Sequence, residues 1–252
     1  MENKIPKVAV VICNKNYGHF IKDAIQSAIL QDYPNRVFYI VDDLSEDNSL
    51  EIIHTLCGEG RIIDSTEEFK LERLEKFNDQ AIYLFKLNKS GGPSRARNFA
   101  IKHAIENGTN LISILDADDI FKQSKLSKSV MKFIEDPELA GVYSDYLHLN
   151  TETGAISYES KWAYDLNKLR QECIVHSGAV LNVNWLKQVG LYDEGMRTCE
   201  DFHLFRRLAQ RGLFVHIPED LVIVRIQPQN STQTVSKEIW QQNYQEAMHI
   251  QL

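Results

Sequence analysis

The 252-residue chain lacks any apolar run long enough to form a membrane helix. Such helices need about 20 mainly apolar residues, and the first apolar run, 8–13, is too short for a membrane span or a signal peptide. Glycine and proline are scarce, with 12 and 6 residues, and no linker rich in them divides the chain. We therefore expect a single domain, 1–252, in the cytoplasm, with peripheral attachment at the inner face of the membrane as an alternative.

The chain also has no excess of positive charge: it contains 28 Lys and Arg and 35 Asp and Glu, which gives a net charge of −7. General nucleic-acid binding needs a basic face, so this balance argues against that class of protein. The cysteines Cys13, Cys57, Cys173 and Cys199 show no paired spacing typical of a metal site, and they lie in apolar contexts. We expect reduced, mostly buried thiols.

The stretch NLISILDADD, at 110–119, runs from apolar residues directly into three carboxylates. Its apolar part predicts a strand covered on both faces, as in parallel sheets flanked by helices. Asp116, Asp118 and Asp119 follow at the C-terminal end, the edge where ligands bind in open α/β sheets. Alternation along an extended chain points Asp116 and Asp118 to one side, toward a hard cation or sugar hydroxyls. A turn or helix cap accounts for one Asp, whereas three crowded carboxylates repel one another.

The chain before this stretch alternates strand-like runs, polar loops and helix-like runs. These segments are 7–13, 14–18 and 20–30; then 36–41, 42–49 and 50–56; then 81–87, 88–94 and 95–107. Such alternation predicts an α/β fold with a Rossmann-like mixed, mainly parallel sheet flanked by helices. The charged segment 59–80 interrupts the order, and its apolar positions predict a surface helix with one side formed by Phe69, Leu71, Leu74 and Phe77.

The second half of the chain predicts more strands and helices. Expected strands are 140–149, 155–158, 177–183, 213–217 and 221–226, with a hairpin turn at 151–154. Expected helices are 124–135, a short helix that follows the 177–183 strand and ends at 188, 200–210 and 236–250. The segment 159–172 is expected to be a loop with a short helix. The last helix is amphipathic, which is typical of packing on its own domain or of a homodimer contact.

Two helix starts carry charged or hydrogen-bonding groups. Gly91 and Gly92 precede a helix N-terminus, where free backbone N–H groups and the helix dipole favour an anion, and Lys89, Arg95 and Arg97 add positive charge. A tight loop with ordinary capping is the alternative. The helix at 200–210 opens with the acidic pair Glu200-Asp201, and acidic residues commonly open helices.

The ordered set VAVVICNKN, IVDDLSEDNS, NKSGGPSRARN, LDADD and EDFHLFRRLAQRG resembles the family 2 glycosyltransferases, whose fold is called GT-A. The resemblance covers roughly 7–231. It implies a metal-dependent, inverting transferase that moves a sugar from a nucleoside diphosphate sugar, expected to be a UDP-sugar, to a hydroxyl acceptor. The acceptor would be a glycan, a lipid-linked glycan or another hydroxyl compound, with surface polysaccharide or glycoconjugate assembly as the default role. We assign the nucleotide-sugar half to 1–119, the acceptor half to 120–235 and a C-terminal helix to 236–252.

The resemblance also implies roles for individual residues. Those matching the donor-binding positions are Cys13, Asn14, Asn16, Asp42, Asp43, Gly91, Gly92, Arg95, Asp116 and Asp118. Within this set Asp43 is the expected base contact, with Asp42 sharing that contact or supporting the loop. Asp116 and Asp118 match the D-x-D motif that holds Mn²⁺ or Mg²⁺ against the diphosphate, where the cation stabilises the charge of the leaving group. Asp201 matches the catalytic base, with Glu200 as the alternative.

The chain departs from the family pattern at two places. Lys15 stands where an aromatic residue often stacks on the base, and the segment VRIQPQNST has no histidine to add a cation ligand. Two other functions remain open: a sugar nucleotidyltransferase, for which the loop NKNYGHF is a poor glycine-rich match, and an inactive domain that binds a nucleotide or glycan. Aromatic residues of the second half offer sugar-stacking surfaces or ordinary packing, namely Trp162, Tyr164, Trp185 and Tyr192.

Overall fold

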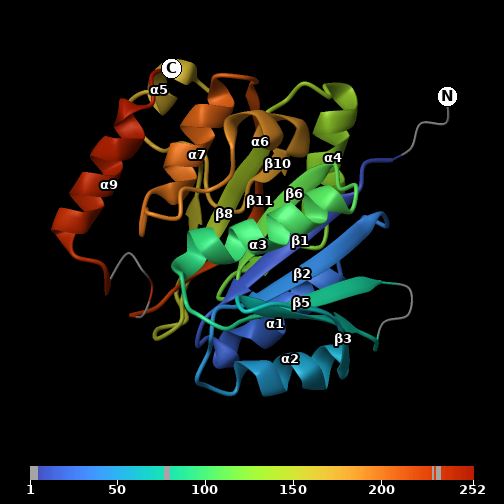
Figure 1. Cartoon of the computed structure of the whole chain (residues 1–252). Helices are drawn as coiled ribbons and strands as arrows, with labels where there is room; N and C mark the ends of the chain where they lie inside the picture. The colour runs from blue at the N-terminus through green and yellow to red at the C-terminus, as the bar shows by residue number, and fades with distance from the viewer. Residues whose placement is uncertain (1–4, 77–79, 229, 231–233) are drawn as a thin grey trace.

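The computed structural model describes residues 5–76, 80–228, 230 and 234–252 (Figure 1). The strands are β1 Val8–Asn14, β2 Arg36–Asp42, β3 Gly60–Ser65, β4 Phe69–Leu74, β5 Ala81–Leu87, β6 Leu111–Asp116, β7 Ile120–Phe121, β8 Gly141–Asn150, β9 Ile156–Glu159, β10 Val180–Asn182 and β11 Phe214–Ile226. The helices are α1 Gly18–Ile29, α2 Ser49–Cys57, α3 Gly92–Glu106, α4 Lys125–Glu135, α5 Leu166–Leu169, α6 Val183–Val189, α7 Glu200–Ala209 and α9 Lys237–His249.

All described strands join one mixed sheet, in the order β3-β4-β5-β2-β1-β6-β10-β8-β11-β7, with β9 paired to β8. The central pairs β5-β2, β2-β1 and β1-β6 are parallel. Their register pairs Asn14 with Asp42 and Cys13 with Asp116. The α/β prediction is therefore confirmed, and the polar strand ends meet at one edge of the sheet.

Two apolar cores cover the two faces of the sheet. In β1, Val8, Val10 and Ile12 pack into the core shared with α1, α2 and α4, whereas Ala9 and Val11 pack into the core shared with α3 and α7. This alternation follows from the period of two along a strand, and burial on both faces explains the unbroken apolar run. Figure 1 shows α3 lying across the sheet, with α7 and then α9 beside it.

The helix predicted within 59–80 is wrong, because β3 and β4 form an antiparallel hairpin that extends the sheet from β5. Phe69 and Leu71 pair with Leu87 and Phe85. The charge of the segment suggested a solvated helix, but Glu72 is 5% exposed and bonds to His54, at 2.9 Å, and to Lys86. Phe77, expected on the same helix face, lies outside the described residues.

The second half follows the prediction more closely. The hairpin β8–β9 and the short helix α5 lie where they were expected, while the two predicted late strands are one strand, β11, with irregular pairing between Ile217 and Val222. Helix α9 packs on α7 of its own chain, and Arg206 of α7 donates to the carbonyl oxygen of Ile250 at 2.6 Å. A homodimer through α9 stays a prediction. Among the described residues, no helix is long and apolar enough to cross a membrane.

Lys125, at the start of α4, gives a stability prediction. It is fully buried, its Nζ has no hydrogen-bond partner among the described residues, and burial lowers its pKa to about 7. The unfolded chain, with a pKa near 10.5, then binds one proton more than the folded chain between pH 7 and 10. Lys125 should therefore destabilise the fold at and below pH 7, and this cost should fall by roughly 1 kcal/mol per pH unit above it.

At pH 6.5, Lys125→Met should have a higher free energy of unfolding than the wild type. Near pH 10 the free energies of unfolding of the two proteins should be nearly equal. Urea denaturation across this range measures the difference, with Lys102→Met, at an exposed position of α3, as the matched control. A difference between Lys125→Met and wild type that does not change with pH would contradict the burial of a neutral amine.

Candidate functional site

A cavity of about 680 Å³ opens at the sheet edge where β1 and β6 end. Its wall comes from these strand ends, the start of α3, the loops around 161, 175 and 198, the start of α7, and α9. The volume lies within the range of about 300–1,000 Å³ that is typical of small-molecule sites. The predicted site residues that line it are Cys13, Asn14, Asp43, Gly92, Asp116, Asp118, Glu200 and Asp201, whereas Asn16, Asp42, Gly91 and Arg95 do not.

Asp42 and Asn16 support the loops behind the cavity. Asp42 is 1% exposed and accepts hydrogen bonds from the Asn14 side chain, at 2.8 Å, and the Ser45 backbone, at 2.9 Å. Asn16 has a φ of 58°, which Asn tolerates better than most residues, and its side chain accepts from the Glu46 backbone at 2.8 Å. Of the two roles considered for Asp42, these contacts fit loop support.

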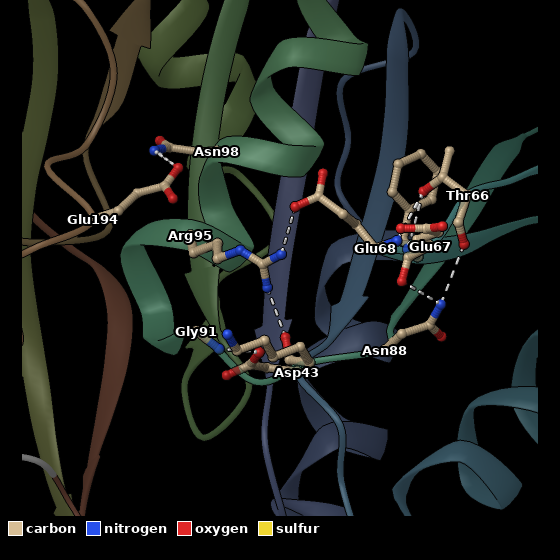
Figure 2. A network of polar contacts seen from close by, with 11 residues as sticks. Asp43, Thr66, Glu67, Glu68, Asn88, Gly91, Arg95, Asn98 and Glu194 are labelled. Carbon is tan, nitrogen blue, oxygen red and sulfur yellow. Dashed lines mark hydrogen bonds and ion pairs between the residues drawn. The ribbon is translucent and has the colours of Figure 1, made fainter.

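Asp43 closes the glycine loop that precedes α3. Its carboxylate accepts from the Ser90 hydroxyl at 2.8 Å and from the backbone N–H groups of Gly91 and Gly92, each at 3.0 Å. Figure 2 shows Asp43 beside Gly91. The anion that meets these N–H groups is thus a carboxylate of the chain itself, so of the two alternatives for this helix start the contacts fit a capped loop rather than a free anion site. A carboxylate accepts up to about four hydrogen bonds, so Asp43 retains acceptor capacity toward the cavity.

Arg95 is directed away from the cavity. Its guanidinium donates to the carbonyl oxygen of Lys89 at 2.6 Å and to Glu68 at 3.0 Å, and it lies over the ring of Phe99 (Figure 2). These contacts tie the glycine loop to the turn between β3 and β4. Arg95 therefore holds the loop, and the structure does not place it for direct contact with a ligand in the cavity.

The arginine of the cavity is Arg97, which the sequence indicated only as added positive charge. It is 3% exposed and donates to Asp116 at 2.8 Å and to Glu200 at 2.7 Å, with Asp201 at 3.7 Å. One guanidinium thus joins the end of β6 to the start of α7. The spacing of residues along α3 indicates that Arg97 is buried, because it lies one turn from Ala100 and Ile101 on the buried face of the helix.

Asp201 is the member of the acidic pair whose pKa is raised. Burial raises its pKa to about 7; Arg97 opposes this shift, while Glu200 and Asp116 add to it. Cys199, which directly precedes the acidic pair, has a φ of 57°, an uncommon backbone conformation for a residue other than glycine that tends to occur at functional sites. A carboxyl group with a pKa near neutrality is suited to accept and release a proton.

The aspartates after β6 line the cavity through a turn. The strand ends at Asp116, so the alternation argument does not extend to Asp118, although both line the wall. Asp118 accepts from Gln227 at 3.1 Å and from Asn230 at 2.9 Å, and burial together with Asp116 raises its pKa to about 6. Asp119 also lines the cavity, and its carboxylate accepts a hydrogen bond from the Arg225 backbone at 3.1 Å.

Asp116 and Asp118 are the candidate ligands for a hard divalent cation in this cavity. Among the residues that the structure describes, no three His, Cys, Asp or Glu side chains are grouped as a metal site. Asp116 and Asp118 fit such a cation in their chemistry, because both are carboxylates on the cavity wall whose mutual repulsion a positive ion would relieve. The remaining ligands would have to come from water or from a bound diphosphate.

Trp162, Tyr164, Trp185 and Tyr192, for which sugar stacking and ordinary packing were the two alternatives, do not line the cavity. Trp185 donates its indole N–H to the carbonyl oxygen of Glu138, and Tyr192 is 4% exposed against Arg97. The aromatic residues of the wall are Tyr17, Phe202, Trp240 and Tyr244. Trp240 and Tyr244 reach the wall through the long-range packing of α9 on α7, which the local sequence pattern does not reveal.

Replacing Arg97 should destabilise the protein strongly. Arg97→Met leaves Asp116 and Glu200 without their shared cation, and breaking a buried ion pair by removing one partner costs about 3–5 kcal/mol. Urea denaturation should show a loss in that range, and Arg95→Met, which breaks a pair with the exposed Glu68, should cost about 1 kcal/mol or less. Equal losses for the two variants would contradict the central position given to Arg97.

Comparison with protein families matches residues 9–179 to Glycosyl transferase family 2. An uncharacterized glycosyltransferase of Rickettsia felis is 27% identical over 87% of this chain, and the chain spans 33% of that protein's length. The hyaluronan synthase of Pasteurella multocida is 24% identical over 85% of this chain, which spans 20% of its length.

Solved structures show the same fold. S. aureus TarS 1-349 in complex with UDP-GlcNAc has a TM-score of 0.71 at 16% identity, covering 95% of this chain and 66% of that one. The mannosyltransferase PcManGT from Pyrobaculum calidifontis, in complex with GDP-Man and Mn²⁺, has a TM-score of 0.66 at 18% identity, covering 98% and 69%. The match to the family extends over more than half of the chain, and the order of strands and helices agrees with it. The chain therefore belongs to glycosyl transferase family 2 and has the GT-A fold.

Proposed function

We propose that this chain is an inverting glycosyltransferase that moves a sugar from a UDP-sugar to a hydroxyl acceptor with the aid of Mn²⁺ or Mg²⁺. The observation that carries the proposal is the single cavity wall that brings Asp43, the pair Asp116 and Asp118, and Asp201 together from three distant parts of the sequence. These residues supply, in one space, a base contact, cation ligands and a proton acceptor.

The donor would occupy the part of the cavity formed by the ends of β1 and β6 and the start of α3. Asn14, Lys15 and Pro93 line this part together with Asp43, whose carboxylate can accept the ring N–H of uracil. Asp116 and Asp118 would hold the divalent cation. When bound, that cation stabilises the negative charge that the departing diphosphate retains.

Asp201 would act as the general base toward the acceptor hydroxyl. Glu200 is held by Arg97 at 2.7 Å, whereas Asp201 is 3.7 Å from the same guanidinium and its Oδ1 has no hydrogen-bond partner among the described residues. Asp201 is thus the less constrained of the two and has the raised pKa. Removal of the hydroxyl proton by Asp201, with attack from the face opposite the diphosphate, gives inversion at the sugar carbon.

Names of related proteins support a role in polysaccharide assembly. They include a hyaluronan synthase and a chondroitin synthase of Pasteurella multocida and a putative teichuronic acid biosynthesis glycosyltransferase of Bacillus subtilis. TarS with UDP-GlcNAc supports a UDP-sugar, and PcManGT with Mn²⁺ supports a divalent cation. A cytoplasmic location, with or without peripheral attachment to the membrane, stays a prediction.

Asp43→Ala should weaken UDP binding by about 1 to 3 kcal/mol, the cost of losing a hydrogen bond to a charged group. Asp43→Ala also removes the hydrogen bonds that Asp43 accepts from Ser90, Gly91 and Gly92. Asp43→Asn is therefore the more specific variant, because it keeps the shape of the side chain but can place an amide N–H donor opposite the N–H donor of uracil. Isothermal titration with UDP in the presence of Mn²⁺ measures both. If UDP bound both variants as tightly as the wild type, Asp43 would not be the base contact.

The configuration of the product tests the inverting mechanism. With a UDP-sugar of α configuration, proton NMR of the first product formed should show the coupling of a β anomer. An α anomer in the first product would refute inversion and with it the role of Asp201 as base.

A further inference from the structure

We propose that Arg197, Lys161, Trp240 and Tyr244 form an acceptor subsite for a saccharide that carries an anionic group, either a carboxylate or a phosphate. All four line the cavity, and they come from the loop before α7, the segment after β9, and α9. The subsite rests on the proposed function, because it names the chemical class of acceptor for that transfer.

Charge is the first support. Four cationic side chains line the described cavity wall: Lys15, Arg97, Lys161 and Arg197. Arg97 is paired with carboxylates and Lys15 donates to Ser90, but neither Lys161 nor Arg197 has a carboxylate partner among the described residues. The ammonium of Lys161 lies 5.6 Å from the centroid of the Tyr146 ring. Two cations without counter-ions in a cavity of an acidic chain favour an anionic ligand.

Their position relative to Asp201 is the second support. Arg197 precedes Asp201 by four residues, and the intervening Thr198 accepts a hydrogen bond from Asn243 of α9 at 3.1 Å, which fixes this loop against the helix. Lys161 approaches from another segment. Burial raises the pKa of Cys173 to about 12; Asp201 adds to this shift and Lys161 opposes it, so both charges act on one thiol of the cavity wall. Lys161 and Asp201 thus face the same part of the wall, where an anionic group held by Lys161 would lie near the proposed base.

The aromatic side chains of α9 are the third support. Trp240 and Tyr244 are separated by four positions and so lie on one face of the helix. Tyr244 is fixed by stacking on Phe202, at 5.6 Å between ring centroids, and by its hydroxyl, which donates to Gln171 at 2.5 Å. The indole N–H of Trp240 is buried and has no hydrogen-bond partner among the described residues. An aromatic ring on the cavity wall suits the apolar face of a sugar ring.

The test is equilibrium binding to the full chain without a donor, with three probes. They are an oligosaccharide that contains glucuronate, the same oligosaccharide with its carboxyl groups reduced to alcohols, and a glycerol phosphate oligomer. Wild type should bind at least one anionic probe about tenfold more tightly than the reduced one, which corresponds to one charged hydrogen bond. The probe that gains this affinity identifies a carboxylate or a phosphate as the source.

Variants assign the effect to the subsite. Arg197→Ala and Lys161→Ala should each remove most of the preference, Arg197→Lys should keep part of it, and the exposed controls Arg211→Ala and Lys102→Ala should keep all of it. Trp240→Leu should weaken all bound probes alike, since it removes the ring and not the charge.

Two outcomes would overturn the subsite: no preference of wild type for either anionic probe over the reduced one, or full preference retained in both Arg197→Ala and Lys161→Ala. UDP affinity, measured separately, should be unchanged in all these variants. Failure of wild type to bind UDP would instead count against the proposed function.

Discussion

Asp201→Asn should lower the rate of sugar transfer by about 10²-fold or more while UDP affinity changes little. Asn has nearly the same shape as Asp but cannot take a proton from an acceptor hydroxyl. Asp201 has the features of a base, because its pKa is raised to about 7 and the cation beside it, Arg97, bonds more closely to Glu200. Steady-state rates with saturating donor, together with UDP titration, separate the two quantities.

Asp193→Asn is the matched control, because Asp193 is an exposed acid of the loop before α7 and does not line the cavity. Its transfer rate should equal that of wild type. Glu200→Gln should disturb Arg97 and reduce the rate, but by less than Asp201→Asn. If Asp201→Asn kept most of the transfer activity, Asp201 would not be the group that accepts the proton of the acceptor hydroxyl.

Asp118→Ala should abolish the dependence of UDP binding on Mn²⁺. The fold should survive, because removing this carboxylate relieves its repulsion with Asp116 and leaves only the bonds from Gln227 and Asn230 unmade. Calorimetric titration of UDP with and without Mn²⁺ measures the difference, which should be large in wild type and absent in the variant.

Asp64→Ala, at an exposed position of β3, is the control and should bind UDP with the same Mn²⁺ dependence as wild type. Thermal unfolding of Asp118→Ala should give a midpoint close to that of wild type. Unchanged Mn²⁺ dependence in Asp118→Ala would show that the cation, if used, is held by other residues.

Much of the site was predictable because it lies where buried parallel strands end. Strands such as β1 and β6 are apolar on both faces, so their limits are marked by the first polar residues, and parallel pairing brings those residues to one edge. That is why Asn14, Asp43 and Asp116 could be placed together before the structure was known.

What the sequence could not show depends on long-range packing. Helical spacing places Arg97 on the buried face of α3, but only the packing of that helix on the sheet shows that Arg97, and not Arg95, lines the cavity. The hairpin β3–β4 was missed because Glu72 is buried against an ion pair with Lys86 and a hydrogen bond with His54, and both partners lie in other elements. Trp240 reaches the cavity because the end of α9 is held to α7 by bonds from Arg206 to backbone carbonyl groups.

The most direct test of the central claim is release of nucleoside diphosphate from a panel of nucleotide sugars by the wild-type chain with Mn²⁺. The account predicts release of UDP from at least one UDP-sugar, dependent on the cation and much reduced in Asp201→Asn. Release of a different nucleoside diphosphate, such as GDP, would correct only the donor. Pyrophosphate formed from UTP and a sugar phosphate, with no nucleoside diphosphate released from any member of the panel, would contradict the account.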